Sequence, residues 1–168
     1  AQKTQNDIIP IAEIYKRVFD TYPEWSKERL IMEFYKNVNG FRDDLGNVKI
    51  VKYKRDVKAE GNYLVWSKKH VLILNQYKTS DKFGRIEYNI PPQIINYLTH
   101  QNKQIGDLMI SKDNGEKYGS YGNLSSVIGT MLKRSGVKTD ENTNDGAVNL
   151  LRHSFITNEL SKITTTKD

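Results

Sequence analysis

Three polar side chains near the end of the chain have a spacing that would let them bind one anion together. In the stretch AVNLLRHSFITNEL, residues 147–160, Asn149, Arg152 and His153 are spaced i, i+3 and i+4. On a helix this spacing places them on one arc, beside an apolar stripe that includes Leu151. A guanidinium group can donate to two phosphate oxygens at once, and an asparagine amide can donate a further bond. The alternative interpretation is a solvent-facing polar stripe whose arginine pairs with a carboxylate.

Two basic residues elsewhere could complete such a site. Arg42 follows Gly40 at the end of a predicted helix, where a side chain can project into a cleft. Lys78 stands at the approach to a predicted β-hairpin tip, an element that could reach over a substrate. Each also has an ordinary interpretation. Arg42 could form a surface salt bridge, and Lys78 could be a charge that keeps the hairpin soluble.

The composition favours a partner that carries phosphates and excludes cysteine chemistry. The 168 residues include 26 Lys and Arg against 20 Asp and Glu, a net charge of +6, and such an excess is typical of nucleic-acid binding. Because there is no cysteine, disulfides, thiolate zinc sites and cysteine nucleophiles are excluded. No apolar run is long enough for a membrane span and no signal peptide is evident, so we expect no membrane partner and an intracellular setting. A first residue other than Met suggests a fragment.

Periodicity predicts one α+β domain over residues 1–168, in which helices dominate. The expected order is two helices, a small antiparallel sheet, and three helices. Apolar spacing predicts helices over 7–22 and from Ser26, an N-cap candidate, to residue 38. Runs rich in β-formers follow over 47–90. The last three helices are expected after the prolines at 91–92, over 123–134 before Gly136, and from about Asp145.

Taken together, three of these stretches resemble the catalytic domain of the tyrosine recombinases, or phage-type integrases. NGFRDDLGNVKIV resembles the first box, in which a Gly-x-Arg turn supplies the first catalytic arginine, here Arg42. YKTSDKFGRIEYNIPPQIINYL resembles the β-hairpin lysine segment and maps to Lys78. NLLRHSFIT resembles the second box, His-x-x-Arg-His-Ser/Thr-Phe, and maps to Asn149 and Arg152. The resemblance covers roughly Ile8 to Leu160. Within the family, the chain is most similar to recombinases of large DNA viruses and their mobile elements.

The resemblance implies a mechanism on double-stranded DNA that needs no metal and no cofactor. A tyrosine would attack a phosphodiester, forming a 3′-phosphotyrosine link while the 5′-hydroxyl leaves. Arg42 and Arg152 would bind the nonbridging oxygens, and Lys78 would be the general acid for the leaving oxygen. His153 would be a buried supporting residue. Self-association on DNA is also implied, whereas in solution we expect a monomer.

The chain departs from the family pattern at three places. Asn149 stands where the family usually has histidine, and asparagine cannot exchange a proton near neutral pH. Asp43 and Asp44 directly follow Arg42, whereas the family's acid comes one step later; Asp44 is the candidate for its supporting role. No tyrosine follows Tyr121, so we expect the nucleophile in a segment beyond the end of this chain.

Three other interpretations remain open. A type IB topoisomerase uses a similar Arg-Lys-Arg pocket but would relax supercoils alone, whereas a recombinase would pair sites and exchange strands. A diverged DNA-binding module would keep the phosphate clamp without catalysis, and its gene would not continue to a tyrosine. A basic helical domain with coincidental motifs predicts that Arg42, Lys78 and Arg152 do not converge in space.

Overall fold

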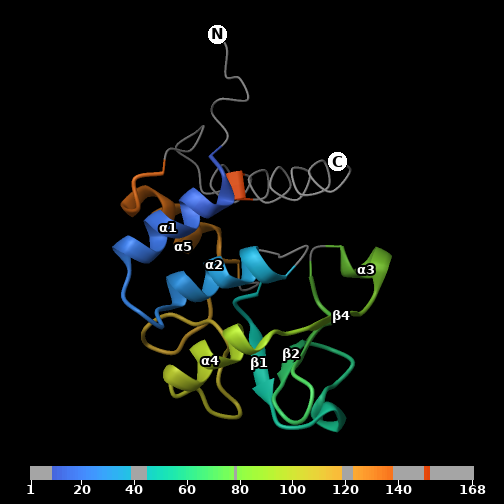
Figure 1. Cartoon of the computed structure of the whole chain (residues 1–168). Coiled ribbons are helices and arrows are strands. Elements are labelled where there is room, and N and C mark those ends of the chain that lie inside the picture. Colours follow the sequence, from blue (N-terminus) through green and yellow to red (C-terminus); the bar gives the residue numbers. More distant parts are fainter. Residues whose placement is uncertain (1–8, 39–44, 78, 119–122, 138–149, 152–168) are drawn as a thin grey trace, which may run out of the picture. The chain divides into compact units, whose positions relative to one another are not determined.

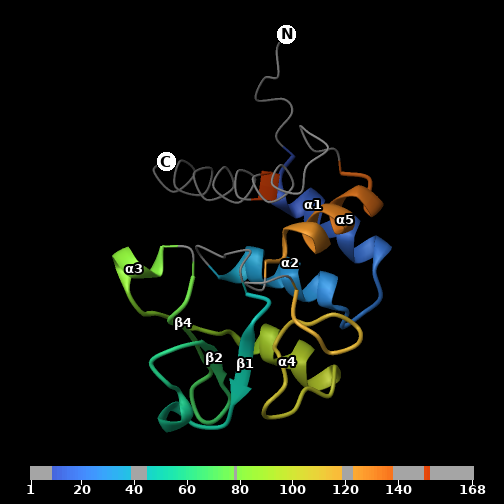
Figure 2. The same ribbon diagram turned by 180° about the vertical axis from the view of Figure 1, so that it is seen from behind.

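The chain divides into two compact units that both contain described secondary structure (Figures 1 and 2). The computed structural model describes residues 9–38, 45–77, 79–118, 123–137 and 150–151. The first unit comprises Ala1–Asn39 and Ser125–Asp168, and the second is Gly40–Leu124. The predicted α+β class is confirmed. The recombinase-like fold and the single catalytic-core domain over 1–168 stay predictions.

Three described helices form the first unit, as periodicity predicted. They are α1 (Ile11–Thr21), α2 (Lys27–Asn37) and α5 (Ser125–Arg134). The apolar stripe of α1 is buried at Ile11, Ile14 and Val18, because residues three and four apart share one helix face. Ser26 is the predicted N-cap of α2, and its Oγ accepts a hydrogen bond from the Arg29 backbone N–H at 3.3 Å.

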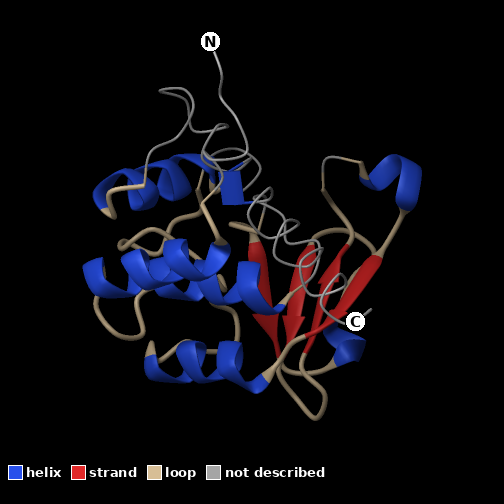
Figure 3. Cartoon of the chain, turned by 45° about the horizontal axis from the view of Figure 1, so that its top comes forward, coloured by secondary structure: helices blue, strands red, loops and turns tan. Residues whose placement is uncertain are grey.

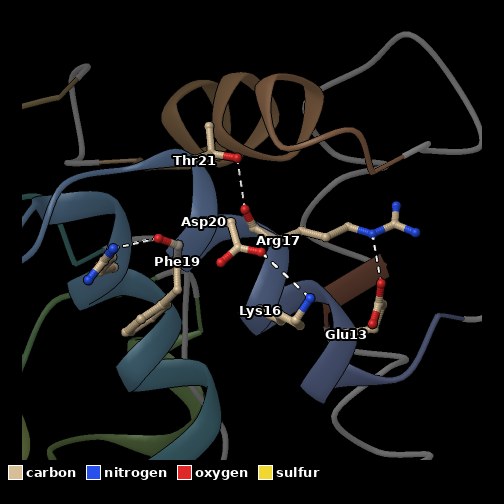
Figure 4. A network of polar contacts seen from close by, with 7 residues as sticks. Glu13, Lys16, Arg17, Phe19, Asp20 and Thr21 are labelled. Atoms are coloured by element: carbon tan, nitrogen blue, oxygen red, sulfur yellow. Dashed lines mark hydrogen bonds and ion pairs between the residues drawn. The ribbon is translucent and has the colours of Figure 1, made fainter.

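Ion pairs cover the solvent side of α1 (Figure 4). The guanidinium Nε of Arg17 lies 3.1 Å from Oε1 of Glu13, and Nζ of Lys16 lies 3.7 Å from Oδ2 of Asp20. Both are exposed i, i+4 pairs, which contribute a few tenths of a kcal/mol each. The stability of this helix therefore depends on its buried stripe rather than on these pairs.

Two stacked aromatic rings of α1 contact two cationic side chains of α2. The rings of Tyr15 and Phe19 stack with centroids 4.0 Å apart. Lys36 lies over the Tyr15 ring at 4.2 Å and Arg29 lies over the Phe19 ring at 4.5 Å. Tyr15 also donates a hydrogen bond to the buried Glu33 carboxylate. The two helices are thus joined by two cation–π contacts and a charge-assisted hydrogen bond.

The end of α5 is attached to α1. Gly136 has φ 75°, and Val137 N–H donates to the Leu132 carbonyl at 2.9 Å, closing the helix as predicted. A guanidinium N–H of Arg17 donates to the Gly136 carbonyl at 2.9 Å. These contacts connect a helix near the start of the chain to one more than a hundred residues later.

The second unit contains a four-stranded sheet in the order β1-β2-β3-β4 (Figure 3). The strands are β1 (Val48–Val51), β2 (Asn62–Val65), β3 (Val71–Leu74) and β4 (Ile86–Asn89). β2 pairs with β3, and β3 with β4, in the antiparallel direction that we predicted.

The expectation of a wholly antiparallel sheet is wrong, because β1 and β2 are parallel. Their connection contains the 3₁₀ helix η2 (Lys54–Asp56) and returns the chain to the end of the sheet from which β1 started. Gly61, at φ 92°, then turns the chain into β2. This connection is shorter than the usual parallel crossover. The alternating pattern of β1 does not report strand direction, so the sequence could not reveal it.

The β3–β4 connection also differs from the simple hairpin tip that we expected. It contains a helical turn, α3 (Ser80–Phe83), which ends at Gly84 with φ 72°. The Gly84 N–H donates to the Ser80 carbonyl at 2.8 Å. The strands on either side still pair as a hairpin.

Residues after α4 protect the free edge of β1. The helix α4 (Pro92–His100) begins with Pro92 in its first turn, as predicted. The short apolar segment that follows then pairs with β1. Gly106 N–H donates to the Ile50 carbonyl at 2.8 Å, and Met109 N–H donates to the Val48 carbonyl at 2.8 Å. An edge strand with its backbone groups paired is not free to pair with another chain.

Candidate functional site at one end of the sheet

The six predicted site residues lie outside the described part of the chain. They are Arg42, Asp44, Lys78, Asn149, Arg152 and His153. Their positions and mutual distances stay predictions. What the structure describes is the set of residues next to them in the sequence and the elements to which those residues belong.

A buried residue lies within three positions of each of three predicted basic residues. Leu45 follows Arg42 by three residues and is 2% exposed, and Tyr77 directly precedes Lys78 and is 8% exposed. Leu151 directly precedes Arg152, is helical as predicted, and is fully buried.

The sheet brings the neighbours of Arg42 and Lys78 to one end. In the register, Val48 pairs with Asn62, Asn62 pairs with Leu74, and Leu74 pairs with Ile86. The chain therefore enters β1 and leaves β3 at the same end of the sheet. In a wholly antiparallel sheet, β3 would run parallel to β1, and its last residue would lie at the opposite end of the sheet. The parallel pairing of β1 with β2 is what changes this.

Asn62 ties together the strand ends at this site. The residue is 2% exposed, and its side chain makes four hydrogen bonds. Oδ1 accepts from the backbone N–H groups of Asn75 and Gln76, both at 2.9 Å. Nδ2 donates to Oδ1 of Asn47 at 3.0 Å and to the Gln76 carbonyl at 2.8 Å. The entry to β1 and the exit from β3 are thus bonded to one buried amide, whose bonding capacity is filled.

A second layer of hydrogen bonds surrounds this amide. Oδ1 of Asn75 accepts from Nε of Arg85 at 2.8 Å, and Nδ2 of Asn75 donates to the Lys58 carbonyl at 3.0 Å. The hydroxyl of Tyr77 donates to the Gly84 carbonyl at 2.6 Å. Tyr77 and Gly84 therefore hold the two sides of the β3–β4 connection together across residues 78–83.

Sequence reasoning missed Asn62, since NYLVW was assigned only as a run of β-formers. A signal was present: Asn62 is the one polar residue that opens an otherwise apolar strand, directly after Gly61. An asparagine there adds nothing to a hydrophobic core and is disfavoured in strands. Such a residue indicates a specific hydrogen-bonding role, although the partners cannot be read from the sequence.

Within the described ranges, no group of three or more His, Asp or Glu side chains is arranged to hold a metal ion. No helix in those ranges is both long and apolar enough to cross a membrane. No protein-family model, curated protein or solved structure matches the chain. A chemical role therefore has to be inferred from the motifs and from the described end of the sheet.

Proposed function

We propose that this chain is the phosphate-binding core of an enzyme that cleaves and rejoins DNA strands through a 3′-phosphotyrosine intermediate, as tyrosine recombinases do. The observation that carries the proposal is the parallel pairing of β1 with β2. It brings the neighbours of Arg42 and Lys78 to one end of the sheet, where two residues of a shared pocket would have to lie. Asn62 donates hydrogen bonds to Asn47, which follows Arg42 by five residues, and to Gln76, which precedes Lys78 by two.

The proposed chemistry divides between charge stabilisation and proton transfer. Arg42 and Arg152 bind the nonbridging oxygens of the scissile phosphate, whose charge grows in the transition state. Asn149 donates a hydrogen bond to the same phosphate. Lys78 protonates the 5′-oxygen as it leaves. His153 and Asp44 support the two arginines.

The covalent step conserves the energy of the phosphodiester bond. The nucleophile's phenolic oxygen forms a bond to phosphorus as the bond to the 5′-oxygen breaks, and attack by a 5′-hydroxyl reverses the step. None of the 17 positions from Arg152 to Asp168 is a tyrosine. We propose that the nucleophile is a tyrosine outside residues 1–168.

The test uses the full-length natural protein, called the extended protein below, on nicked duplexes whose cleaved strand cannot be rejoined. We expect a covalent protein–DNA adduct that mass spectrometry maps to a tyrosine outside residues 1–168. The 168-residue chain should bind the same duplexes without forming an adduct. An adduct mapped to a tyrosine within residues 1–168 would contradict the assignment of the nucleophile.

A second readout separates the recombinase from its rivals. Exchange of strands between two paired sites identifies a recombinase, whereas relaxation of supercoiled DNA without exchange identifies a type IB topoisomerase. Binding to duplexes of many sequences with no adduct at all would reject the proposed catalysis and leave a DNA-binding module.

A further inference from the structure

The opposite end of the sheet carries a group of exposed cations that the proposed site does not use. At this end Val51, Val65 and Val71 are paired in register. In Figure 1 the end of β1 and η2 lie there, away from α3. Strands of four residues separate the two ends by about 10 Å of backbone.

Two of the cations are ordered on one aromatic ring. The guanidinium carbon of Arg55 lies 4.2 Å from the centroid of the Tyr53 ring, and Nζ of Lys52 lies 5.3 Å from it. Both side chains are exposed. Stacking on the ring restricts the cations without neutralising them, so they are pre-positioned to meet an anion.

The β2–β3 turn brings two more lysines to the same end. Ser67 N–H donates to the Lys52 carbonyl at 2.9 Å, which places the start of this turn beside the end of β1. Lys68 and Lys69 follow directly, and both are exposed. Lys52, Arg55, Lys68 and Lys69 together form what we call the basic patch.

Basic residues outnumber acidic residues around the basic patch. Residues 45–77 contain seven Lys or Arg and two Asp or Glu. One of the two acids, Asp56, accepts a hydrogen bond from the Tyr53 N–H at 3.0 Å and so caps η2. Glu87 lies 3.3 Å from Nζ of Lys54, a lysine outside the basic patch. Among the residues that the structure describes, no carboxylate forms an ion pair with a member of the basic patch.

We infer that the basic patch binds phosphates of duplex DNA outside the cleavage site. Exposed lysines and a stacked arginine suit backbone phosphates, because they offer charge and short reach without a pocket to select a base. The choice of DNA as the polyanion rests on the proposed function. The basic patch would add affinity that is independent of sequence, while the chemistry proceeds at the other end of the sheet.

The experiment measures duplex DNA binding by the 168-residue chain at several salt concentrations. The test variants are K68E/K69E and K52E/R55E. The matched control is K112E/K117E, which reverses the charge of two exposed lysines in the same unit. These lysines stand beside Asp113 and Glu116 in the sequence. Circular dichroism and urea midpoints verify that each variant folds.

We expect each test variant to bind at least about tenfold more weakly at low salt, and the control to weaken by less than about threefold. The slope of log K against log salt should fall by about 0.9 for each phosphate that the variant no longer binds. Equal weakening in test and control variants would overturn the inference, because net charge alone would then explain it. A slope of log K against log salt that is unchanged in the test variants would also overturn the inference.

Failure of this inference can be told apart from failure of the proposed function. In the extended protein at saturating DNA, K68E/K69E should still form the covalent adduct, because the basic patch does not contact the reacting phosphate. If the adduct forms and the test variants bind DNA normally, only the inference about the basic patch is rejected. A binding defect confined to the test variants, with no adduct from any protein, rejects the catalysis alone.

Discussion

Nδ2 of Asn62 donates a hydrogen bond to Oδ1 of Asn47 at 3.0 Å, across two strands that run in the same direction. Asn47 directly precedes β1 and Asn62 opens β2. The same amide accepts the backbone N–H groups of Asn75 and Gln76. One side chain thus connects the sequence that follows Arg42 with the sequence that precedes Lys78.

Asn62→Ala should lower the free energy of unfolding by about 2–4 kcal/mol, because it removes four hydrogen bonds and leaves the backbone N–H groups of Asn75 and Gln76 without their acceptor. Urea unfolding of the 168-residue chain measures the change. Asn96→Ala is the control, since Asn96 is exposed within α4, and it should change stability by less than about 0.5 kcal/mol. Equal effects of the two substitutions would show that the Asn62 bonds contribute little.

Glu33→Ala should destabilise the contact between α1 and α2. The Glu33 carboxylate is buried and accepts hydrogen bonds from the Tyr15 hydroxyl and from Nδ2 of Asn37, the latter at 2.9 Å. Removing a buried charged acceptor costs about 1.5–3 kcal/mol. Glu33→Gln, which keeps one oxygen, should cost less, and Glu24→Ala on the exposed turn should cost almost nothing. Thermal unfolding should give the lowest midpoint for Glu33→Ala, a higher one for Glu33→Gln and the highest for Glu24→Ala. Any other order of midpoints would argue against the contact.

Tyr22 should make the protein less stable at alkaline pH. Burial raises the pKa of Tyr22 above its usual 10.0, and the Glu28 carboxylate raises it further, while Arg134 opposes the shift. A raised folded-state pKa contributes stability that is complete below pH 10 and is lost as pH rises through the folded-state pKa. Urea midpoints measured from pH 8 to pH 11.5 should therefore fall less steeply in Tyr22→Phe than in the unsubstituted chain. Parallel curves would rule out this contribution.

Gly136→Ala should cost about 1 kcal/mol through the backbone alone. The residue has φ 75°, and a Cβ added there would meet nothing within 4 Å, so no steric clash contributes. Asparagine tolerates the left-handed region better than alanine, and Gly136→Asn should therefore cost less. Chemical denaturation of both variants checks this. An alanine variant as stable as the asparagine variant would mean that the helix end relaxes.

In the extended protein, Arg42→Ala and Arg152→Ala should each slow DNA cleavage about 100-fold or more, while duplex affinity changes only a few-fold. The reason is that, in the proposed mechanism, the two guanidinium groups act on charge that develops in the transition state. Single-turnover cleavage and equilibrium binding separate these effects. Unimpaired cleavage by either variant would remove that arginine from the site.

Lys78→Ala should also slow cleavage of ordinary DNA. The rate of cleavage by this variant should recover when sulfur replaces the 5′-bridging oxygen, because a thiolate leaves without a proton. The arginine variants should show no comparable recovery. A lysine variant that stays slow on the sulfur-containing substrate would show that Lys78 is not the general acid.

Local patterns were enough to predict the elements of the first unit. The positions of α1, α2 and α5, the cap at Ser26 and the stop at Gly136 all follow from interactions within a few residues. Helix periodicity and caps are encoded locally, so a single sequence reveals them. The partners of these helices, such as Arg17 with the Gly136 carbonyl, were not predictable.

The sequence by itself determined which residues could carry chemistry, because residue type and spacing along the chain decide that directly. It determined the α+β class for the same reason. Only the tertiary structure decided the direction of β1 relative to β2, since side-chain alternation is identical in parallel and antiparallel strands. That direction puts the neighbours of Arg42 and Lys78 at one end of the sheet and the basic patch at the other. Asn62 holds the first arrangement through bonds to residues 13 to 15 positions away, a range that no local pattern reports.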